Sequence, residues 1–280
     1  MPELPEVETV RRGLAPHVVG RVIERVIVRD RRLRWPIARG FERKLAGRTI
    51  RAVDRRGKYL LLDLGGSPTD APDGRDRVIL HLGMTGRLSL IAPGRAVQKH
   101  DHLDLELSGG LVLRLNDPRR FGAALWWPAS HPTHMLLKHM GPEPFADGFG
   151  ADYLFGLARG RSAPVKNFLM DGRVVVGVGN IYAVESLFRA GIRPQRAAGR
   201  VTRAGYAKLA RAVRDVLSDA IAAGGTTFRD FRNSNDQPGY FVQKLNVYDR
   251  AGEPCRKCRT PIKRLVIGQR SSYYCPACQR

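Results

Sequence analysis

The beginning of the chain, MPELPE, places one potential amine nucleophile beside two carboxylates. If Met1 is removed, as a small second residue such as proline usually permits, Pro2 becomes a free secondary amine near Glu3 and Glu6. An α-amino group has a pKa of about 7.7–8.0, against about 10.4 for lysine, so far more of it is unprotonated near neutral pH. A secondary amine that adds to an aldehyde carbon yields a positively charged iminium, an electron sink suited to covalent catalysis. The alternative, from these residues alone, is that Pro2 only starts a strand or a helix.

Four cysteines near the C-terminus have the spacing of a metal site. They follow the pattern C-x2-C-x16-C-x2-C, at Cys255, Cys258, Cys275 and Cys278. Two such pairs match a tetrahedral four-thiolate zinc site, in which every ligand position is filled and the metal is structural. The alternative is redox or disulfide chemistry, which the cytoplasmic character of the chain disfavours. Residues 255–280 also contain seven Arg and Lys residues and no acidic residue, a composition suited to contact with a phosphate backbone.

A zinc-dependent nucleobase deaminase is excluded by the sequence. The run from Pro254 to Cys258 matches one half of the deaminase signature, P-C-x-x-C, whose other half is H-x-E. The motif H-x-E does not occur anywhere in the chain. The cysteines are therefore predicted to form a structural site only.

Two segments, HLGMTGR at 81–87 and NDPRRFGA at 116–123, are predicted to be tight turns that present bulky side chains. Met84 and Phe121 stand at the tips of these turns, and Arg119 lies beside Phe121 in the sequence. Proteins that kink DNA insert apolar side chains between base steps, and arginine can contact the pairing edges that the insertion exposes. Each turn alone is more often a plain hairpin, but the two together on a basic chain indicate base extrusion.

Four further polar residues, in three segments, are candidates for contact with phosphate. Lys58 begins an apolar run in RRGKYLLLDL and is interpreted as a general acid/base, a phosphate anchor or an ordinary solvated lysine. Asn180 lies where a glycine-rich turn meets a predicted helix, as a cap or a donor, in a position suited to holding a phosphate. His100 and His102 are expected on one face of a strand, with too few nearby ligands for a second metal.

The charge balance indicates a polyanionic partner. The 280 residues include 48 Lys and Arg against 26 Asp and Glu, which gives a net charge of +22. Such an excess favours nucleic acid, because neutralising phosphates releases condensed counterions. No segment reaches the ~18–20 apolar residues that span a bilayer, and the N-terminus lacks the apolar core of a signal peptide. We therefore expect a cytoplasmic protein with nucleic acid as its leading partner class and without a membrane partner.

The elements that must position these residues follow from hydrophobic periodicity. The pattern predicts a helix over 6–19 that ends or kinks near His17, and then at least six short strands from about 21 to 127. Strands in such a series indicate a two-sheet sandwich or barrel. Helical periodicity returns over 151–223, with a Thr N-cap candidate at Thr202, and a long loop follows.

These motifs together resemble one family, the bacterial formamidopyrimidine-DNA glycosylases (Fpg, also called MutM), from Pro2 to the C-terminus. The similar segments are PELPEVETVRRGL, RGKYLL, HLGMTGRL, KHDHLDL, DPRRFG, VVGVGNIYAVESLF, GGTTFRDF and QRSSYYC. The closely similar endonuclease VIII branch typically has glycine in place of Leu4. The resemblance implies an α+β multidomain fold with four parts: a β-sandwich catalytic domain with a flanking helix (1–130), a linker (131–150), a helix–two-turn–helix domain with a lesion-capping loop (151–235) and a β-hairpin zinc finger (236–280).

The resemblance also implies a role for each candidate residue. Pro2 would be the nucleophile that attacks C1′ of the damaged nucleotide, Glu3 would transfer a proton during opening of the sugar, and Glu6 would hold the N-terminus in place. Lys58 is similar to the family's lysine of base release and proton transfer. Met84, Arg119 and Phe121 would fill the gap in the base stack. The residues implied to contact DNA are His100, Arg119, Arg161, Lys166 and Asn180. Arg270 would contact the DNA backbone at the catalytic site and is counted among the catalytic residues, and the zinc ligands would be Cys255, Cys258, Cys275 and Cys278.

The activity implied by the resemblance is excision of oxidised purines, such as 8-oxoguanine and formamidopyrimidines, followed by β,δ-elimination in base excision repair. The expected partner is double-stranded DNA with an oxidised purine or an abasic site, bound by a monomer. One structural Zn2+ is expected, and no redox cofactor. The segment GGTTFRDFRNSNDQPGYF is expected to cover the flipped base. The mechanism requires removal of Met1, because the nitrogen of Pro2 is otherwise an amide.

Three alternatives stand beside this interpretation. An endonuclease VIII-like enzyme that acts on oxidised pyrimidines is disfavoured by Leu4 and by DPRRFG. A non-catalytic DNA-binding protein would not require the set of Pro2, Glu3 and Lys58. A zinc-ribbon RNA-binding module would not need the two turns at 81–87 and 116–123, called the wedge turns below. Incision of a duplex distinguishes such a module from the glycosylase.

Overall fold

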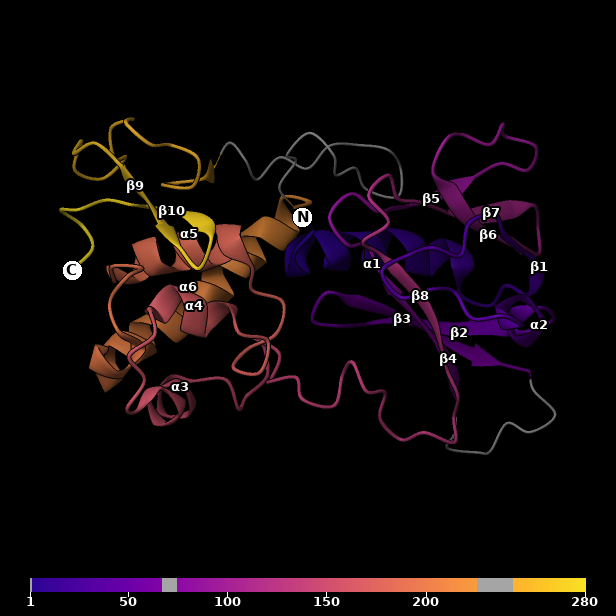
Figure 1. The fold of residues 1–280 in the computed structure, drawn as a ribbon, viewed down its shortest axis with the longest axis horizontal. Helices are drawn as coiled ribbons and strands as arrows, with labels where there is room; N and C mark the ends of the chain where they lie inside the picture. The colour runs from indigo at the N-terminus through magenta and orange to yellow at the C-terminus, as the bar shows by residue number, and fades with distance from the viewer. Residues whose placement is uncertain (1, 67–74, 226–243) are drawn as a thin grey trace. The chain divides into compact units, whose positions relative to one another are not determined.

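The computed structural model describes residues 2–66, 75–225 and 244–280. The chain divides into two compact units, Met1–Lys138 with Ala223–Tyr240 and His139–Ala222 with Phe241–Arg280. Figure 1 shows the elements of both units, with strands concentrated in the first and helices in the second.

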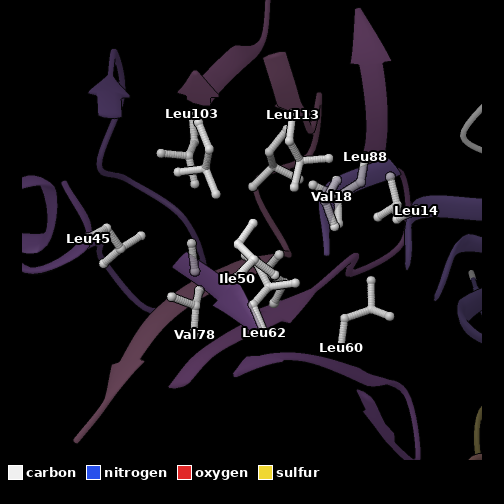
Figure 2. Close-up of a cluster of buried hydrophobic side chains, with 14 of the residues drawn as sticks. Leu14, Val18, Leu45, Ile50, Leu60, Leu62, Val78, Leu88, Leu103 and Leu113 are labelled. Atoms are coloured by element: carbon white, nitrogen blue, oxygen red, sulfur yellow. The ribbon is translucent and has the colours of Figure 1, made fainter. Parts of the chain in front are cut away.

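The first unit contains two four-stranded antiparallel sheets, with the strand orders β1-β6-β7-β5 and β2-β3-β4-β8. The strands are β1 (Ile23–Val28), β2 (Thr49–Arg56), β3 (Tyr59–Gly65), β4 (Asp76–His81), β5 (Arg87–Ile91), β6 (Asp101–Leu107), β7 (Leu111–Asn116) and β8 (Ala123–Trp127). Their apolar side chains form one core, to which Leu62 and Val78 contribute from one sheet and Leu103 and Leu113 from the other (Figure 2). This arrangement confirms the predicted β-sandwich.

Helix α1 (Leu4–Val18) flanks the sandwich and packs on its core. A capping box fixes its start: the Glu3 side chain accepts a backbone hydrogen bond from Glu6, and the Glu6 carboxylate accepts the Glu3 N–H at 2.8 Å. Pro16 lies in the last turn, where loss of one backbone hydrogen bond costs least. The helix therefore continues through Pro16 and ends close to the predicted position near His17.

Two local features of the first unit go beyond the predicted pattern. The run TIRAVDRRGKYLLLDL forms two strands, β2 and β3, because a two-residue turn at Gly57 and Lys58 reverses the chain. A short helix, α2 (Phe41–Leu45), was not predicted, since five residues are too few to show a helical period. It is held by burial of Phe41 and Leu45.

The second unit is mainly helical. Its helices are α3 (Ala151–Ala158), α4 (Val165–Met170), α5 (Asn180–Ala190), the 3-10 helix η1 (Ala198–Arg200) and α6 (Arg203–Ala222). Thr202 caps α6 as predicted, because its hydroxyl accepts the Gly205 N–H at 3.0 Å. Helix α5 ends at Gly191, whose φ of +73° suits a left-handed cap.

A small antiparallel hairpin, β9 (Lys263–Ile267) with β10 (Arg270–Tyr274), carries the C-terminal cysteines in the second unit. Its tip has positive φ at both Gly268 and Gln269, as a type I′ turn requires. The module is attached to α5 by Glu185, which is 1% exposed and whose carboxylate accepts backbone N–H groups of Asn246, Val247 and Tyr248 at 2.9–3.0 Å.

Candidate active site

The residues predicted to perform covalent chemistry gather at the start of α1. Pro2, Glu3 and Glu6 are all buried, and the capping box holds both carboxylates at the first turn of the helix. The partial positive charge of a helix N-terminus stabilises carboxylates in this position. Gly225 packs against the same turn: its φ is +84°, and a Cβ there would lie 3.1 Å from Glu6 Oε1. The predicted lesion-covering segment continues from Gly225, and its residues 226–241 lie outside the described part of the chain.

Lys58 lies in the turn between β2 and β3, where Gly57 has a φ of +57°. Glycine at the first position of a two-residue hairpin turn adopts this conformation without steric cost. Arg55 fixes the turn, because its Nη1 donates to the Gly57 carbonyl at 2.9 Å and its Nε donates to Glu8 of α1 at 3.1 Å. One arginine therefore joins the helix that begins beside Pro2 to the turn that carries Lys58.

Glu8 is the centre of this connection. Its carboxylate, on a residue only 8% exposed, accepts hydrogen bonds from Arg11, Arg12 and Arg55 at 2.8–3.1 Å. Burial raises the pKa of Glu8, but the hydrogen bonds and the positive charge outweigh it and lower the pKa to about 2. The carboxylate is therefore ionised throughout the neutral range and holds the three guanidinium groups in place.

The two wedge turns predicted from sequence lie next to each other in the first unit. Phe121 is 43% exposed, Arg119 is exposed, and the Arg119 guanidinium stacks over the Phe121 ring with its Cζ 4.7 Å from the ring centroid. Met84 is half-buried at the other turn. A Cβ on Gly83 would lie 2.4 Å from the Phe121 carbonyl carbon, so the two turns contact each other directly. The structure thus brings the three predicted wedge residues to one edge of the sandwich.

His81, at the end of β4, lies between these turns and Lys58. Its Nδ1 accepts the Gly83 N–H at 3.1 Å, and its ring is also hydrogen-bonded to the backbone of Phe121. Burial, followed by the positive charges of Lys58 and Arg34, lowers the pKa of His81 to about 4. The imidazole is therefore neutral near pH 7, as an acceptor for the Gly83 N–H must be.

His100 lies beside the second wedge turn, because its carbonyl accepts the Asp117 N–H at 3.0 Å. His100 precedes β6 and has a φ of +76°, so it is not a strand residue as expected, but its ring still lies beside that of His102, with the centroids 6.2 Å apart in an edge-to-face arrangement. His102 is 3% exposed, and its Nε2 is hydrogen-bonded to the Asp117 carbonyl at 2.8 Å. Only His100 is thus accessible enough for the predicted phosphate contact.

In the second unit, two of the residues predicted to contact DNA are hydrogen-bonded to β10. Asn180 is the first residue of α5 rather than its cap, and its Nδ2 donates to the Ser271 carbonyl at 3.0 Å. Lys166 of α4 is fully buried, and its Nζ donates to the Ser272 hydroxyl at 2.6 Å. Both contacts fix the strand that begins with the exposed residue Arg270.

Arg161 is the remaining predicted contact residue of the second unit. Its side chain is exposed, its Nε donates to the Leu157 carbonyl at 2.8 Å, and its guanidinium lies over the Phe168 ring, 5.3 Å from the centroid. Stacking on an aromatic ring leaves part of an arginine fork available to an outside acceptor. Its DNA contact stays a prediction.

The four cysteines form one compact cluster with the dimensions of a zinc site. Their sulfur atoms all lie within 4.8 Å of one another, and neighbouring pairs are 3.4–4.0 Å apart. A tetrahedral ion with Zn–S bonds of about 2.3 Å needs sulfur atoms about 3.8 Å apart, so the donors fit Zn2+. Backbone N–H groups of Lys257 and Cys278 point at the sulfurs of Cys255 and Cys275, both at 3.4 Å, which would support thiolate ligands.

Sequence reasoning missed the residues that hold the predicted ones in place. Glu8 could have been found, because Arg11 and Arg12 follow it at i+3 and i+4, the spacing of ion pairs on a helix. Asp117 and Glu185 carry no such signal, since their side-chain partners Thr85 and Asn246 are 32 and 61 positions away along the chain. Only the folded structure shows these contacts.

Comparison with protein families finds three matching models that together account for most of the chain. They are the formamidopyrimidine-DNA glycosylase N-terminal domain over residues 1–124, the formamidopyrimidine-DNA glycosylase H2TH domain over residues 140–232, and a zinc finger found in FPG and IleRS over residues 252–280. The order of these models agrees with the order of sandwich, helices and cysteine hairpin along the chain.

Known proteins with similar sequences and structures agree with these models. The chain is 53% identical to a formamidopyrimidine-DNA glycosylase of Syntrophotalea carbinolica and 54% identical to one of Pseudomonas entomophila, over the whole length of each protein. Its structure is similar to Lactococcus lactis Fpg in complex with DNA containing an abasic site (TM-score 0.89, 31% identity, 99% of each chain). It is also similar to MutM (Fpg) of Thermus thermophilus (TM-score 0.86, 38% identity, 99% of this chain and 98% of that one).

Proposed function

This chain belongs to the formamidopyrimidine-DNA glycosylase family, and on that basis we propose that it is a bifunctional DNA glycosylase and AP lyase of base excision repair. Its proposed substrates are 8-oxoguanine and formamidopyrimidines in duplex DNA, and abasic sites. The observation that carries the lyase chemistry is Pro2, buried at the start of α1 beside the carboxylates of Glu3 and Glu6. DNA binding alone does not require an amine in such a setting.

In the proposed reaction the nitrogen of Pro2 forms a bond to C1′ while the bond between C1′ and the base breaks. The Pro2 nitrogen loses its N–H proton in this step, and the departing base takes up a proton. Glu3 then supplies a proton to O4′ as the sugar ring opens, which leaves an iminium between C1′ and the Pro2 nitrogen. The iminium acidifies the C2′ proton, whose loss expels the 3′ phosphate, and a second elimination expels the 5′ phosphate. Lys58 is placed in the proton transfers of base release, each of which contributes about 10²–10⁴ in rate. Hydrolysis of the final iminium frees Pro2.

We assign the DNA contacts by the same reasoning. Met84, Arg119 and Phe121 would fill the gap left by the extruded nucleotide, with Arg119 facing the orphaned cytosine. The residues proposed to contact the DNA backbone are His100, Arg161, Asn180 and Arg270, and Lys166, which the family resemblance also implies near the DNA, is proposed to position the strand of Arg270. In support, the wedge residues lie on adjacent turns, and Asn180 and Lys166 hold the strand of Arg270. The burial of Lys166 makes it a positioning residue in this structure rather than a direct contact.

The proposal includes one structural Zn2+, bound by the four cysteines, which would hold β9 and β10 together and present Arg270. We also propose that the chain has four parts, at residues 1–130, 131–150, 151–235 and 236–280. The proposed enzyme is a monomer without a redox cofactor, and its proposed location is the cytoplasm, in association with the nucleoid. Among residues 2–66, 75–225 and 244–280, no helix is long and apolar enough to cross a membrane.

The experiment that tests the mechanism is borohydride trapping on a labelled duplex with 8-oxoguanine opposite cytosine. Reduction of the iminium should give a stable protein–DNA adduct, and peptide mapping by mass spectrometry should locate it on the nitrogen of Pro2. The matched control is the same protein with a short N-terminal extension, in which that nitrogen is an amide. This control should still bind the duplex but give no adduct.

Two results would contradict the proposed mechanism. An adduct on Lys58 would show a different nucleophile, and efficient trapping by the extended protein would remove the need for a free Pro2 nitrogen. A duplex with an oxidised pyrimidine, run in parallel, tests the endonuclease VIII-like alternative. A preference for that duplex over 8-oxoguanine would overturn the proposed substrate class.

A further inference from the structure

The turns that carry the wedge residues share one buried carboxylate, that of Asp117. This residue is 0% exposed. Its Oδ1 accepts the hydroxyl proton of Thr85, from the Met84 turn, at 2.7 Å, and its Oδ2 accepts the Gly122 N–H, from its own turn, at 2.7 Å. A buried carboxylate needs such partners, because an unpaired charge away from water is strongly unfavourable. Asp117 therefore binds both turns at once.

The Thr85 hydroxyl makes a second contact with the opposite turn. While it donates to Asp117, its oxygen also accepts the backbone N–H of Arg119 at 3.2 Å. A hydroxyl offers one donor and two acceptor sites, so this single group can make both bonds, and neither an alanine nor a valine side chain could make either. Thr85 thus connects the backbone position of one wedge residue to the turn of another.

Close backbone packing reinforces these hydrogen bonds. A Cβ on Gly122 would lie 2.7 Å from the His81 carbonyl oxygen, and the equivalent atom on Gly83 would lie 2.4 Å from the Phe121 carbonyl carbon. The His81 ring accepts the Gly83 N–H and is also hydrogen-bonded to the backbone of Phe121. The two turns therefore meet along their backbones as well as through side chains, and they form one unit.

This unit presents three side chains that must act on the same gap. If the turns moved independently, each would have to be ordered when its side chain entered the base stack, and that ordering would weaken insertion. A pair of turns ordered in advance avoids this cost. We propose that Thr85 and Asp117 are positioning residues that lock both turns into one rigid wedge, so that Met84, Arg119 and Phe121 enter the stack together. The inference rests on the proposed function.

The test replaces Thr85 with valine, which has nearly the same shape but no hydroxyl, and with serine, which restores it. Base extrusion is followed by stopped-flow fluorescence of 2-aminopurine placed beside 8-oxoguanine, and excision is measured in single turnovers. We expect Thr85→Val to slow both steps by about ten- to hundredfold, the effect of losing hydrogen bonds to a buried carboxylate. Cleavage at a preformed abasic site, which needs no extrusion of a base, should change less than about threefold, and Thr85→Ser should stay near wild type.

A matched control separates coupling of the turns from general loss of stability. Thr202→Val makes the same chemical change at the cap of α6 in the second unit, where it should lower the melting temperature without changing the extrusion rate. In a double-mutant cycle, Met84→Ala should cost less in the Thr85→Val background than in the wild type, because the wedge is already uncoupled. Three outcomes would overturn the inference: additive effects of Met84→Ala and Thr85→Val, an equal loss of base extrusion and abasic-site cleavage in Thr85→Val, or extrusion and excision rates unchanged by Thr85→Val. Wild-type protein that extrudes the base without excising it would contradict the proposed function instead.

Discussion

Individual carboxylates at the start of α1 have structural partners as well as proposed chemical roles. Glu3 and Glu6 form the capping box, and Glu8 binds three arginines two helical turns from Pro2. A residue that caps a helix is held in one orientation before substrate arrives, which is what a proton-transfer group requires. The same contacts that begin the helix can therefore set the geometry of the proposed nucleophile.

Glu8 gives a pH prediction at this scale. Its pKa is lowered to about 2 in the folded protein, from an ordinary value near 4.5, because its arginine partners outweigh burial. Its contribution to stability is therefore fully present above pH 4.5 and is lost as the pH falls toward 2, and it amounts to about 3 kcal/mol. Urea unfolding of Glu8→Gln and wild type between pH 7 and 2 should show two curves that converge at low pH.

The exposed residue Glu24 supplies the control for Glu8. Glu24→Gln should give a stability curve parallel to that of the wild type over the whole range. A constant gap between Glu8→Gln and wild type down to pH 2 would mean that the ion pairs do not determine its contribution. Glu8→Gln should also reduce borohydride trapping at neutral pH, since Arg55 would then be less firmly held against the Lys58 turn.

At the scale of elements, the strands and the longer helices could be predicted, whereas the contacts between them could not. Alternating apolar residues indicate a strand such as β6 without any knowledge of its partner, and Thr202 marks the start of α6 through its local hydrogen bond. The contact between Thr85 and Asp117 depends on how two hairpins meet. For the same reason the sequence could not predict that Lys166, expected near DNA, is buried in the interior with its Nζ hydrogen-bonded to Ser272.

Glu185 gives a prediction for how the elements of the second unit hold together. Its carboxylate accepts three consecutive backbone N–H groups, and Glu185→Gln would replace one of its acceptors with a donor. Since hydrogen bonds to a charged group are worth about 1.5–3 kcal/mol, we expect a clear loss of stability in this unit and faster release of zinc to a chelator. Thermal unfolding and a colorimetric zinc assay measure the two effects.

The matched change for Glu185 is Glu253→Gln, which lies in the cysteine module that Glu185 anchors but affects an exposed residue that pairs with Arg250. An exposed ion pair contributes little, so this variant should release zinc at the wild-type rate. Equal rates for the two variants would show that α5 does not anchor the module. Glu253→Gln also keeps the net charge equal in the comparison, so that differences in DNA binding cannot come from charge alone.

At the scale of the whole molecule, the sandwich and the cysteine module are stabilised in different ways. The first has a large continuous core made by both sheets and α1, whereas the cysteine module has a small apolar cluster that includes Val184, Phe188 and Tyr273 together with two of the cysteines. A cluster of that size cannot hold a hairpin by burial alone, and small modules of this kind usually depend on a metal. The net charge of +22 favours DNA binding by the chain as a whole, but only the cysteine module depends on zinc, for its proposed contact by Arg270.

Removal of zinc should therefore affect the units unequally. A strong chelator should unfold β9 and β10, because the free energy of metal binding is the folding free energy of such a site. The sandwich should remain folded, so its tryptophans, all in the first unit, should keep their fluorescence and their melting transition. DNA affinity and its dependence on salt should both fall, since fewer phosphates would be neutralised. Two results would contradict this prediction. One is full DNA affinity after zinc removal, and the other is a sandwich that unfolds together with the zinc module, since either would mean that zinc does not stabilise the cysteine module independently of the sandwich.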